Sequence, residues 1–546
     1  MKLKKIIQYV FAITVVCIGL IACTGVTAKT KNVDIANAAI VQTKSGKLQG
    51  VIKDNIFTYL GVPYAEATER FVPAKEVKPW SGVRNATEYG PVSLQSALTG
   101  FPEAPGIKDN NSQNLNIWTP GLDGNKRAVM VWLHGGGFSS GSAQEVPAYN
   151  GENLSRKGDV VVVSVNHRLN VMGHLDLSAY GEKYKYSANV GVEDIIDSLK
   201  WIQENIANFG GDPENVTIFG ESGGGAKVLA LMTSPYAKGL FHKGIVQSGA
   251  TESMGVNFTT LAASRRVGEL TLKNLGITKD NIDAIQSVPY LKLVEESMKA
   301  QVEAAGEFGL RGALSGQVSM DWEPVVDGDF LPTNPVTPDS FAAAGKDIPL
   351  MIGSNLNEWA GMNLVMGPDK GKTFTNAEIE ERLSKTYGVN KDQVVKEFLT
   401  AFPSKTKEDA LYFDTFIRLP MLKIMSHKAD QNGAPVYAYV MTYDSPLAFH
   451  TAEIPLVFNN PNAASPISTG ADKSEAEKQA IAKMADTMSS AWIYFAKTGK
   501  PAATGLPTWE AYNRKNGATM ILDNKSELKY NHDKKLIQLL VPNYKF

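Results

Sequence analysis

Short apolar runs rich in β-branched residues recur along the chain. The six clearest are Val129–Leu133, Val160–Val165, Val216–Phe219, Ile245–Gln247, Ile348–Ile352 and Val436–Tyr443. Their apolar character is nearly continuous rather than alternating, which is typical of strands buried on both faces of a sheet. The pattern therefore predicts six buried strands.

Helical spacing separates these runs. Apolar residues recur at steps of three and four between residues 192 and 206, which predicts an amphipathic helix. A later helix is marked at both ends, because Ser474 and Glu477 form a capping box and Gly499 stands where the helix stops. Strands that alternate with helices predict an α/β fold with a large, mostly parallel sheet and helices on both faces.

The length of 546 residues would allow several average domains. The chain has no Gly/Ser-rich or Pro-rich linker, no charge run and no internal repeat. We therefore expect residues 29–546 to form a single domain with helical insertions, of which 250–345 is one.

The N-terminus has the layout of an export signal. Three lysines, at positions 2, 4 and 5, precede a mostly apolar run from Ile6 to Ala22. Leu20-Ile21-Ala22-Cys23 resembles a bacterial lipobox, which would make 1–22 the signal and Cys23 a lipidated, membrane-attached first residue. The alternative is cleavage by ordinary signal peptidase after Val26-Thr27-Ala28, which would release a secreted or periplasmic protein.

Cysteine and charge content narrow the classes of partner. The two cysteines, Cys17 and Cys23, both lie at the N-terminus, so the mature chain forms no internal disulfide and relies on core burial. Loss of the lysine-bearing signal changes the formal net charge from −1 to −4. No basic patch indicates a nucleic-acid partner.

The turn after Phe219 carries the first candidate chemistry. It reads Gly220-Glu221-Ser222-Gly223-Gly224, a G-x-S-x-G pattern between a predicted strand and a helix. Such a turn holds the serine in strained backbone and exposes its hydroxyl above the sheet, where the helix N-terminus adds donors. The pattern alone is common in a chain with 48 glycines. Its position after a buried strand makes Ser222 the candidate nucleophile.

A glycine loop follows the strand that ends at Leu133. It reads His134-Gly135-Gly136-Gly137-Phe138. Acyl transfer needs N–H donors aimed at the developing oxyanion, and glycines let adjacent amides turn inward together. We assign the donors to Gly136, Gly137 and Gly223; the alternative is a plain flexible loop.

A histidine must act as the base, and the chain has seven. In α/β enzymes built around such a serine turn, the acid and then the histidine follow the serine along the chain. His450 alone follows a late predicted strand, the one ending at Tyr443. His427 is expected on the surface of a helix, and the remaining histidines are expected to be structural or on the surface.

The acid should follow a strand between Ser222 and His450. The strand Ile348–Ile352 leads to Glu358, whose carboxylate could orient the imidazole. Asp327 is a rival by spacing, but its Val-Asp-Gly-Asp setting indicates a turn. From the residues alone, Glu358 could equally be an exposed loop acid.

Taken together, these motifs resemble the type-B carboxylesterase family of the α/β-hydrolase superfamily, whose bacterial members include para-nitrobenzyl esterases. The resemblance covers nearly the whole mature chain, and its most specific stretch is Asn-Phe-Gly-Gly-Asp-Pro-Glu-Asn-Val-Thr-Ile-Phe at 208–219. Further matching stretches are 59–65, 70–71, 79–80, 115–120, 134–138, 247–249 and the blocks at 358 and 450. The resemblance implies a triad of Ser222, Glu358 and His450 with an oxyanion hole of Gly136, Gly137 and Gly223.

Three positions depart from the family pattern. Gly223 replaces the usual alanine, which keeps the N–H and predicts a looser helix start. Residues 110–113, Asn-Asn-Ser-Gln, replace an acidic-cysteine block, so the usual disulfide is absent. The loop between Ala65 and Arg70 is shorter than usual, which would alter the mouth of the gorge.

The sequence therefore predicts a serine carboxylic-ester hydrolase that forms an acyl-enzyme on small to medium esters. A lipase for longer acyl chains is the alternative within enzymes, and a non-catalytic, cholinesterase-like binding protein is the alternative outside them. We expect a monomer that uses no metal or organic cofactor. Phe138 and Trp359 are expected near the acyl site, although either could be an ordinary core aromatic.

Overall fold

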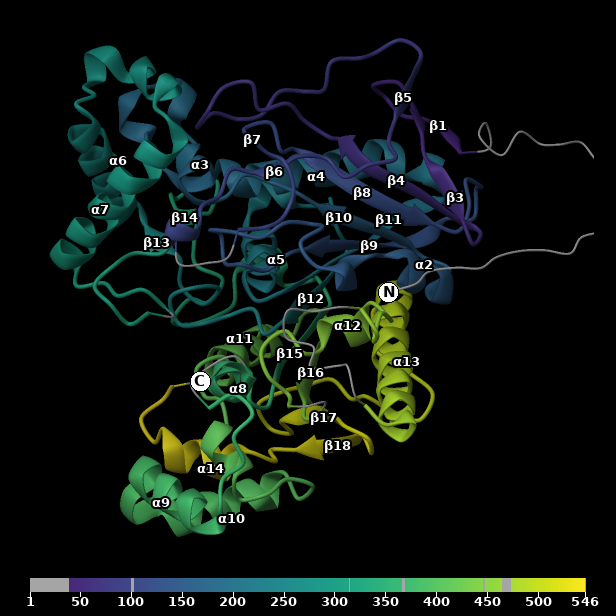
Figure 1. The fold of residues 1–546 in the computed structure, drawn as a ribbon, viewed down its shortest axis with the longest axis vertical. Helices are drawn as coiled ribbons and strands as arrows, with labels where there is room; N and C mark the ends of the chain where they lie inside the picture. The colour runs from purple at the N-terminus through teal and green to yellow at the C-terminus, as the bar shows by residue number, and fades with distance from the viewer. Residues whose placement is uncertain are drawn as a thin grey trace, which may run out of the picture.

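An eleven-stranded sheet runs through the centre of the molecule (Figure 1). The computed structural model describes residues 39–545 apart from 100–102, 314, 366–368, 445–446 and 464–472. Across the sheet the strands are β18 (Glu527–Tyr530), β17 (Ala518–Leu522), β16 (Val436–Met441), β15 (Leu350–Asn355), β12 (Lys243–Gln247), β11 (Gly211–Glu221), β9 (Arg127–Leu133), β10 (Val161–Val165), β8 (Asn114–Thr119), β4 (Ile56–Pro63) and β3 (Val51–Lys53).

The middle of this sheet is parallel. The strands from β17 to β10 in that order pair in parallel, whereas β18, β8, β4 and β3 join the edges by antiparallel pairing. The six predicted strands are six of these parallel ones, and β17 is the seventh. The prediction of an α/β fold with a mostly parallel sheet is confirmed.

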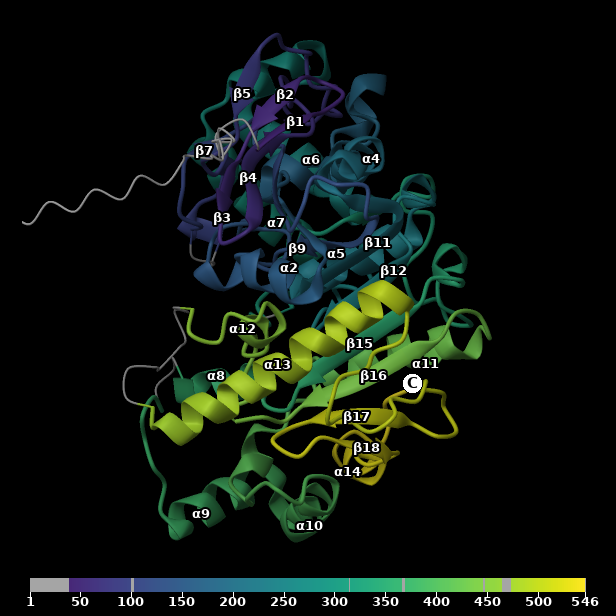
Figure 2. The same ribbon diagram turned by 90° about the vertical axis from the view of Figure 1, so that its right-hand side faces the viewer.

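Both faces of the sheet are covered, as the sequence predicts. On β9, Val129, Val131 and Leu133 enter one core cluster while Met130 and Trp132 enter another, because successive side chains of a strand point to opposite faces. The first face packs on α4 (Val190–Asn205), α5 (Gly223–Thr233) and α11 (Arg418–Asp430). The second packs on α2 (Glu152–Gly158), α12 (Ile454–Val457) and α13 (Glu475–Thr498). Figure 2 shows α13 crossing in front of β15 and β16.

The two predicted helices are present. The 192–206 pattern is α4, which continues as a short 3₁₀ turn, η6 (Ile206–Phe209). The later helix is α13, where Ser474 and Glu477 form the predicted capping box. Gly499 ends α13 in the left-handed region at φ +77°, which a residue without a Cβ adopts at little cost.

Helical insertions extend the sheet domain at both ends (Figure 1). A satellite core gathers α3 (Asn170–His174), α6 (Leu261–Leu275) and α7 (Tyr290–Phe308), and the latter two fall in the predicted insertion. The opposite end carries α9 (Asn376–Tyr387), α10 (Lys391–Ala401) and α14 (Lys534–Leu540). The remaining short strands are β1 (Ile40–Gln42), β2 (Lys47–Gln49), β5 (Val83–Asn85), β6 (Val92–Ser93), β7 (Lys108–Asp109), β13 (Thr259–Thr260) and β14 (Val325–Val326).

The predicted signal segment and Cys23 lie outside the described residues. Within the described part of the chain, no helix combines the length and apolar character needed to span a bilayer.

The parallel strands bring the predicted site loops to one edge. Because β9, β11, β12, β15 and β16 run in the same direction, their carboxyl ends meet along one side of the sheet, where open α/β sheets form their sites. The glycine loop, the serine turn and the loops carrying Glu358 and His450 all follow these strands.

Candidate active site

Ser222 occupies a strained turn between β11 and α5. Its backbone has φ +55° and ψ −127°, a conformation that costs an L-residue about 1–3 kcal/mol. The amide of Ser222 donates to the carbonyl of Gln247 at 2.9 Å, while the Ser222 carbonyl accepts from Gly225 and Ala226. These bonds join the turn to β12 and to the first turn of α5, so the surrounding structure holds the strain.

The glycines around Ser222 are required by close backbone packing. A Cβ at Gly220 would lie 2.5 Å from the carbonyl carbon of Gly224, and one at Gly224 would lie 2.0 Å from the Leu133 carbonyl oxygen. The elbow therefore packs directly against the end of β9, where the glycine loop begins.

The glycine loop at 134–138 turns through left-handed backbone. Gly136 has φ +78° and Gly137 φ +61°, and the Gly136 carbonyl accepts from the amides of Ser139 and Ser140. Among the described residues, the amides of Gly136, Gly137 and Gly223 donate to no partner. All three predicted donors are therefore free to bind an oxyanion.

Gly223 allows the glycine loop to approach the elbow. A Cβ at position 223 would lie 2.3 Å from the Gly137 carbonyl oxygen and 2.4 Å from Gly137 Cα. An alanine would force the loop to move, because real Cβ contacts are never so short. The helix α5 begins at Gly223 itself, and this glycine is buried against the loop; the looser helix start stays a prediction.

Glu358 and His450 form a buried hydrogen-bonded pair. The Nδ1–H of His450 donates to Glu358 Oε2 at 2.7 Å. The other carboxylate oxygen, Oε1, accepts from the Ser248 hydroxyl and the Asn355 amide, each at 2.6 Å. Glu358 is fully buried at the start of α8 (Glu358–Val365), which excludes the alternative of an exposed loop acid.

The second nitrogen of His450 faces an acidic surrounding. Nε2 lies 3.3 Å from Glu221 Oε1 and has no hydrogen bond to any described residue, and the ring packs 4.4 Å from that of Trp359. Burial by itself would lower the pKa of His450, but the carboxylates of Glu221 and Glu358 outweigh it and raise the pKa to about 9. This stabilises the imidazolium, the form that a general base reaches on taking a proton.

Sequence reasoning missed three polar residues of this site. Ser248 and Glu221 each stand at the carboxyl end of a central strand, which is a signal that could have found them. Glu453 accepts from Asn355 Nδ2 at 2.6 Å and from Gln247 Nε2 at 3.1 Å, and no local pattern marks it. Burial raises the pKa of Glu453 and of Glu221 above the usual value of a glutamate.

Phe138 and Trp359 occupy different environments. Trp359 is half-buried and lies against the His450 ring. Phe138 is 1% exposed and packs edge-to-face on His174 and Phe258. This packing favours a core role for Phe138, whereas the acyl-site role of Trp359 stays a prediction.

The rival residues lie away from the pair. Asp327 accepts from the amides of Asp329 and Leu331, so it caps the turn that its sequence indicates. His427 is buried in α11, and its predicted surface position is wrong because α11 lacks a continuous solvent face. His167 and His174 are also buried and donate from Nδ1 to backbone carbonyls.

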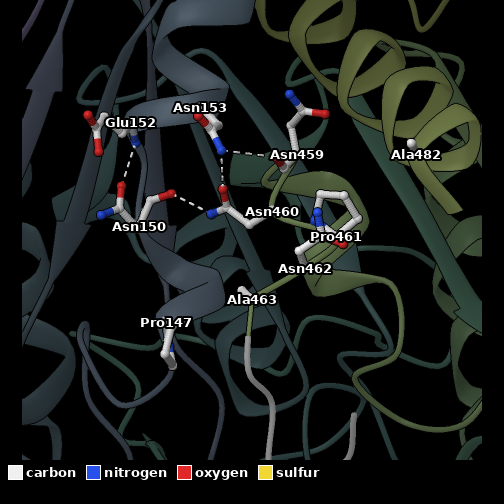
Figure 3. Close-up of a pocket in the computed structure, with 10 residues that line it drawn as sticks. All are labelled: Pro147, Asn150, Glu152, Asn153, Asn459, Asn460, Pro461, Asn462, Ala463 and Ala482. Atoms are coloured by element: carbon white, nitrogen blue, oxygen red, sulfur yellow. Dashed lines mark hydrogen bonds between the residues drawn. The ribbon is translucent and has the colours of Figure 1, made fainter. Parts of the chain in front are cut away.

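A separate surface cleft of about 510 Å³ lies between α2 and the segment after α12 (Figure 3). Asn460 Nδ2 donates to the carbonyls of Ala148 and Asn150 at 2.9 and 2.7 Å, and its Oδ1 accepts from Asn153. The side-chain amides of Asn153 and Asn460 therefore bond to each other, and that of Asn460 also bonds to backbone carbonyls. The cleft wall therefore ties the segment after His450 to the α2 side of the sheet.

Comparison with known proteins decides the family. The model of the carboxylesterase family matches residues 37–539. The chain belongs to the carboxylesterase family. This carboxylesterase therefore hydrolyses carboxylic esters with a serine nucleophile on an α/β-hydrolase fold.

The similarity to known proteins extends over most of each chain. It is 31% identical to a para-nitrobenzyl esterase of Bacillus subtilis, covering 92% of this chain and 99% of that protein. A phenmedipham hydrolase of Pseudarthrobacter oxydans is 29% identical, over 89% and 95%. Among solved structures, an esterase of Clostridium hathewayi described as able to hydrolyse aliphatic aromatic polyesters has a TM-score of 0.79 at 36% identity, over 92% and 97%. A carboxylesterase of Geobacillus stearothermophilus has 0.71 at 32%, over 92% and 99%.

Proposed function

We propose that Ser222, Glu358 and His450 are the catalytic triad of this carboxylesterase. The observation that carries the assignment is the buried 2.7 Å hydrogen bond between Glu358 and His450. It lies at the same sheet edge as the strained turn of Ser222, with Glu221, the residue before the serine, 3.3 Å from His450 Nε2.

The proposed reaction proceeds through an acyl-enzyme. Ser222 Oγ attacks the ester carbonyl carbon while His450 Nε2 accepts the hydroxyl proton. The amides of Gly136, Gly137 and Gly223 stabilise the oxyanion, and loss of one such donor costs roughly 10²–10³ in turnover. The imidazolium gives its proton to the departing alcohol, and water then releases the acid by the same route.

Glu358 fixes the imidazole for this reaction. Its Oε2 holds the proton of His450 on Nδ1, so that Nε2 is left as the base. Ser248 and the Asn355 amide fix the other oxygen. The carboxylate therefore keeps its orientation and stabilises the imidazolium when it forms.

We propose small to medium carboxylic esters as substrates. Relatives named for para-nitrobenzyl ester hydrolysis and for hydrolysis of aliphatic aromatic polyesters support aryl-containing esters within this class. A panel of para-nitrophenyl esters from acetate to palmitate, with an aliphatic aromatic polyester film, tests the range. Highest kcat/KM on long chains with activation at an interface would instead indicate a lipase.

We further propose that the enzyme is exported and acts as a monomer. The lysine-then-apolar layout of residues 1–22 supports export, and Leu20–Cys23 supports anchoring through a lipidated Cys23. Mass spectrometry of the mature N-terminus distinguishes this from cleavage after Ala28, which gives a secreted or periplasmic protein. Light scattering of the soluble domain tests the monomer.

The assignment of Ser222 is tested by substitution and labelling. The wild type should hydrolyse para-nitrophenyl butyrate, and an organophosphate should label Ser222 in a peptide digest. Ser222→Ala should retain only residual activity. Ser198→Ala, which alters a buried serine of α4 that donates to the Ile195 carbonyl, is the matched control and should stay active. Full activity in Ser222→Ala would refute the proposal.

A further inference from the structure

A buried lysine holds the start of the glycine loop. Lys227, on α5, is 0% exposed, and its Nζ donates to the carbonyl oxygen of His134 at 2.8 Å. The same ammonium lies 5.6 Å from the centre of the Phe138 ring, within the range of a cation–π contact. Lys227 therefore contacts both the first and the last residue of the 134–138 loop.

The position is costly for a lysine. Burial lowers the pKa of Lys227 to about 7, opposed by the carboxylate of Glu145. Glu145 accepts a hydrogen bond from Tyr149 at 2.9 Å, and its own pKa is raised by burial. A methionine would fill similar space without this penalty, because buried charges are often replaced by apolar residues at no loss of stability. Stability alone therefore does not account for an ammonium at this position.

Neutral histidines surround the lysine. His134, His167 and His174 each donate from Nδ1 to a backbone carbonyl, and the Nε2 of each has no partner among the described residues. Burial and the nearby Lys227 lower the pKa of all three. Among these residues it is Lys227 that donates to the His134 carbonyl, the first carbonyl of the glycine loop.

We propose that Lys227 is a positioning residue, which orients the glycine loop so that the amides of Gly136 and Gly137 point at the oxyanion. The inference rests on the proposed oxyanion hole. A run of three glycines has little intrinsic preference for one conformation. The bond to the His134 carbonyl fixes the peptide plane from which the run departs, and the contact with Phe138 fixes its far end.

Loss of the Lys227 contacts should destabilise the transition state more than the bound ester. The ammonium binds the backbone carbonyl of His134, directly after β9, and within the described part of the chain it has no hydrogen bond or ion pair with Ser222 or His450. Its loss should therefore leave the nucleophile and the base in place. A small displacement of hole donors lowers turnover, since misplacement by about 1 Å costs up to 10²-fold. Binding of the ground-state ester, which uses the hole less, should change little.

Lys428 provides a matched control. It is also a buried lysine that donates only to backbone carbonyls, those of Gly345 and Lys346, at 2.7 and 3.1 Å. Burial likewise lowers its pKa, to about 8. It lies on α11, and its bonds reach a loop that carries no proposed site residue.

The experiment compares Met and Gln variants at both positions. Lys227→Met should lower kcat for para-nitrophenyl butyrate by roughly 10- to 100-fold with KM within about twofold. The Ki of a trifluoromethyl ketone, whose adduct with serine carries an oxyanion, should rise by the same factor. Lys227→Gln, which keeps an uncharged N–H donor, should fall between wild type and Lys227→Met. Lys227→Gln also tests the proposal if Lys227→Met does not fold. Lys428→Met and Lys428→Gln should match wild type in kcat and in the Ki of the ketone.

Two failures can be told apart. If wild type is not inhibited by the ketone, or if Ser222→Ala binds it equally well, the proposed function is wrong. If wild type binds the ketone through Ser222 but the Lys227 and Lys428 variants have the same kcat and Ki, only the positioning role of Lys227 is wrong.

Discussion

Three residues of the site have strained backbone. Ser222, Ser248 and Glu358 have positive φ values of +55°, +48° and +26°, and each lies within a few residues of a central strand's carboxyl end. Each such residue costs about 1–3 kcal/mol unless its surroundings hold it. In this enzyme the hydrogen bond from Ser248 to Glu358 joins two of the three. Two of the strained residues are therefore bonded to each other across neighbouring loops.

The pH dependence should follow Glu221. His450 must be neutral to act as a base, so kcat/KM should rise as pH increases through its pKa. Glu221 raises that pKa, and Glu221→Gln should therefore lower it and move the acidic limb of the profile to lower pH. Profiles of kcat/KM on para-nitrophenyl butyrate measure the shift. An unmoved or alkaline-shifted limb would show that Glu221 does not control the titration.

Restoring the family alanine at Gly223 should impair the enzyme. Alanine favours a helix over glycine by up to about 1 kcal/mol, but its Cβ would lie 2.3 Å from the Gly137 carbonyl and displace the glycine loop. We expect kcat to fall at least about 10-fold, with no gain in thermal stability. Steady-state kinetics and a thermal melt check this. Unchanged kcat with a higher Tm would mean that the glycine loop accommodates the added Cβ without displacing its amides.

At the scale of elements, the sequence predicted the strands and helices that a local pattern of residues determines. The six strands, α4 and both ends of α13 follow from apolar runs, helical spacing and capping residues. The strand β17 was not predicted. Glu358 could not be chosen over an exposed acid from its own segment, since its partner His450 stands 92 residues away. Contacts of this kind depend on strand order, which a single loop does not encode.

The segment after α12 offers an element-scale test. Asn460 donates to two backbone carbonyls and accepts from Asn153, so Asn460→Ala should destabilise the fold by about 1–3 kcal/mol. Urea unfolding gives the change. Asn462→Ala, at an exposed position of the same cleft, should have little effect, and equal losses would mean that these bonds do not tie the segment down.

At the scale of the whole molecule, burial and buried ion pairs replace covalent links. The described chain contains no cysteine. Arg168 binds Asp194 through two bonds of 2.9 and 2.7 Å and also donates to the Val72 carbonyl, while Gln113 donates to the same carboxylate. This cluster connects α4, which carries Asp194, with Arg168 in the segment after β10. It also reaches Gln113, directly before β8, and the backbone at Val72.

Breaking that pair should destabilise the fold. Asp194→Asn keeps the shape of the side chain but leaves the Arg168 charge buried without compensation, at a cost of about 3–5 kcal/mol. Denaturant unfolding measures it. Glu204→Gln removes an exposed partner of Lys44 and should change stability little. If the two variants unfold alike, the buried pair contributes no more than a surface one.

The strand order has a consequence for how such an enzyme diverges. β9 lies on one side of β11, whereas β12, β15 and β16 lie on the other. The groups proposed to stabilise charge and those proposed to transfer protons are thus inherited from opposite halves of the chain, meeting at Ser222. The two halves nevertheless touch at the site, because Glu221 lies 3.3 Å from His450 Nε2 and the Ser222 amide donates to the carbonyl of Gln247 on β12. A chimera joined between α5 and β12, which carries the second half of a related esterase, therefore stays active only if it keeps these two contacts.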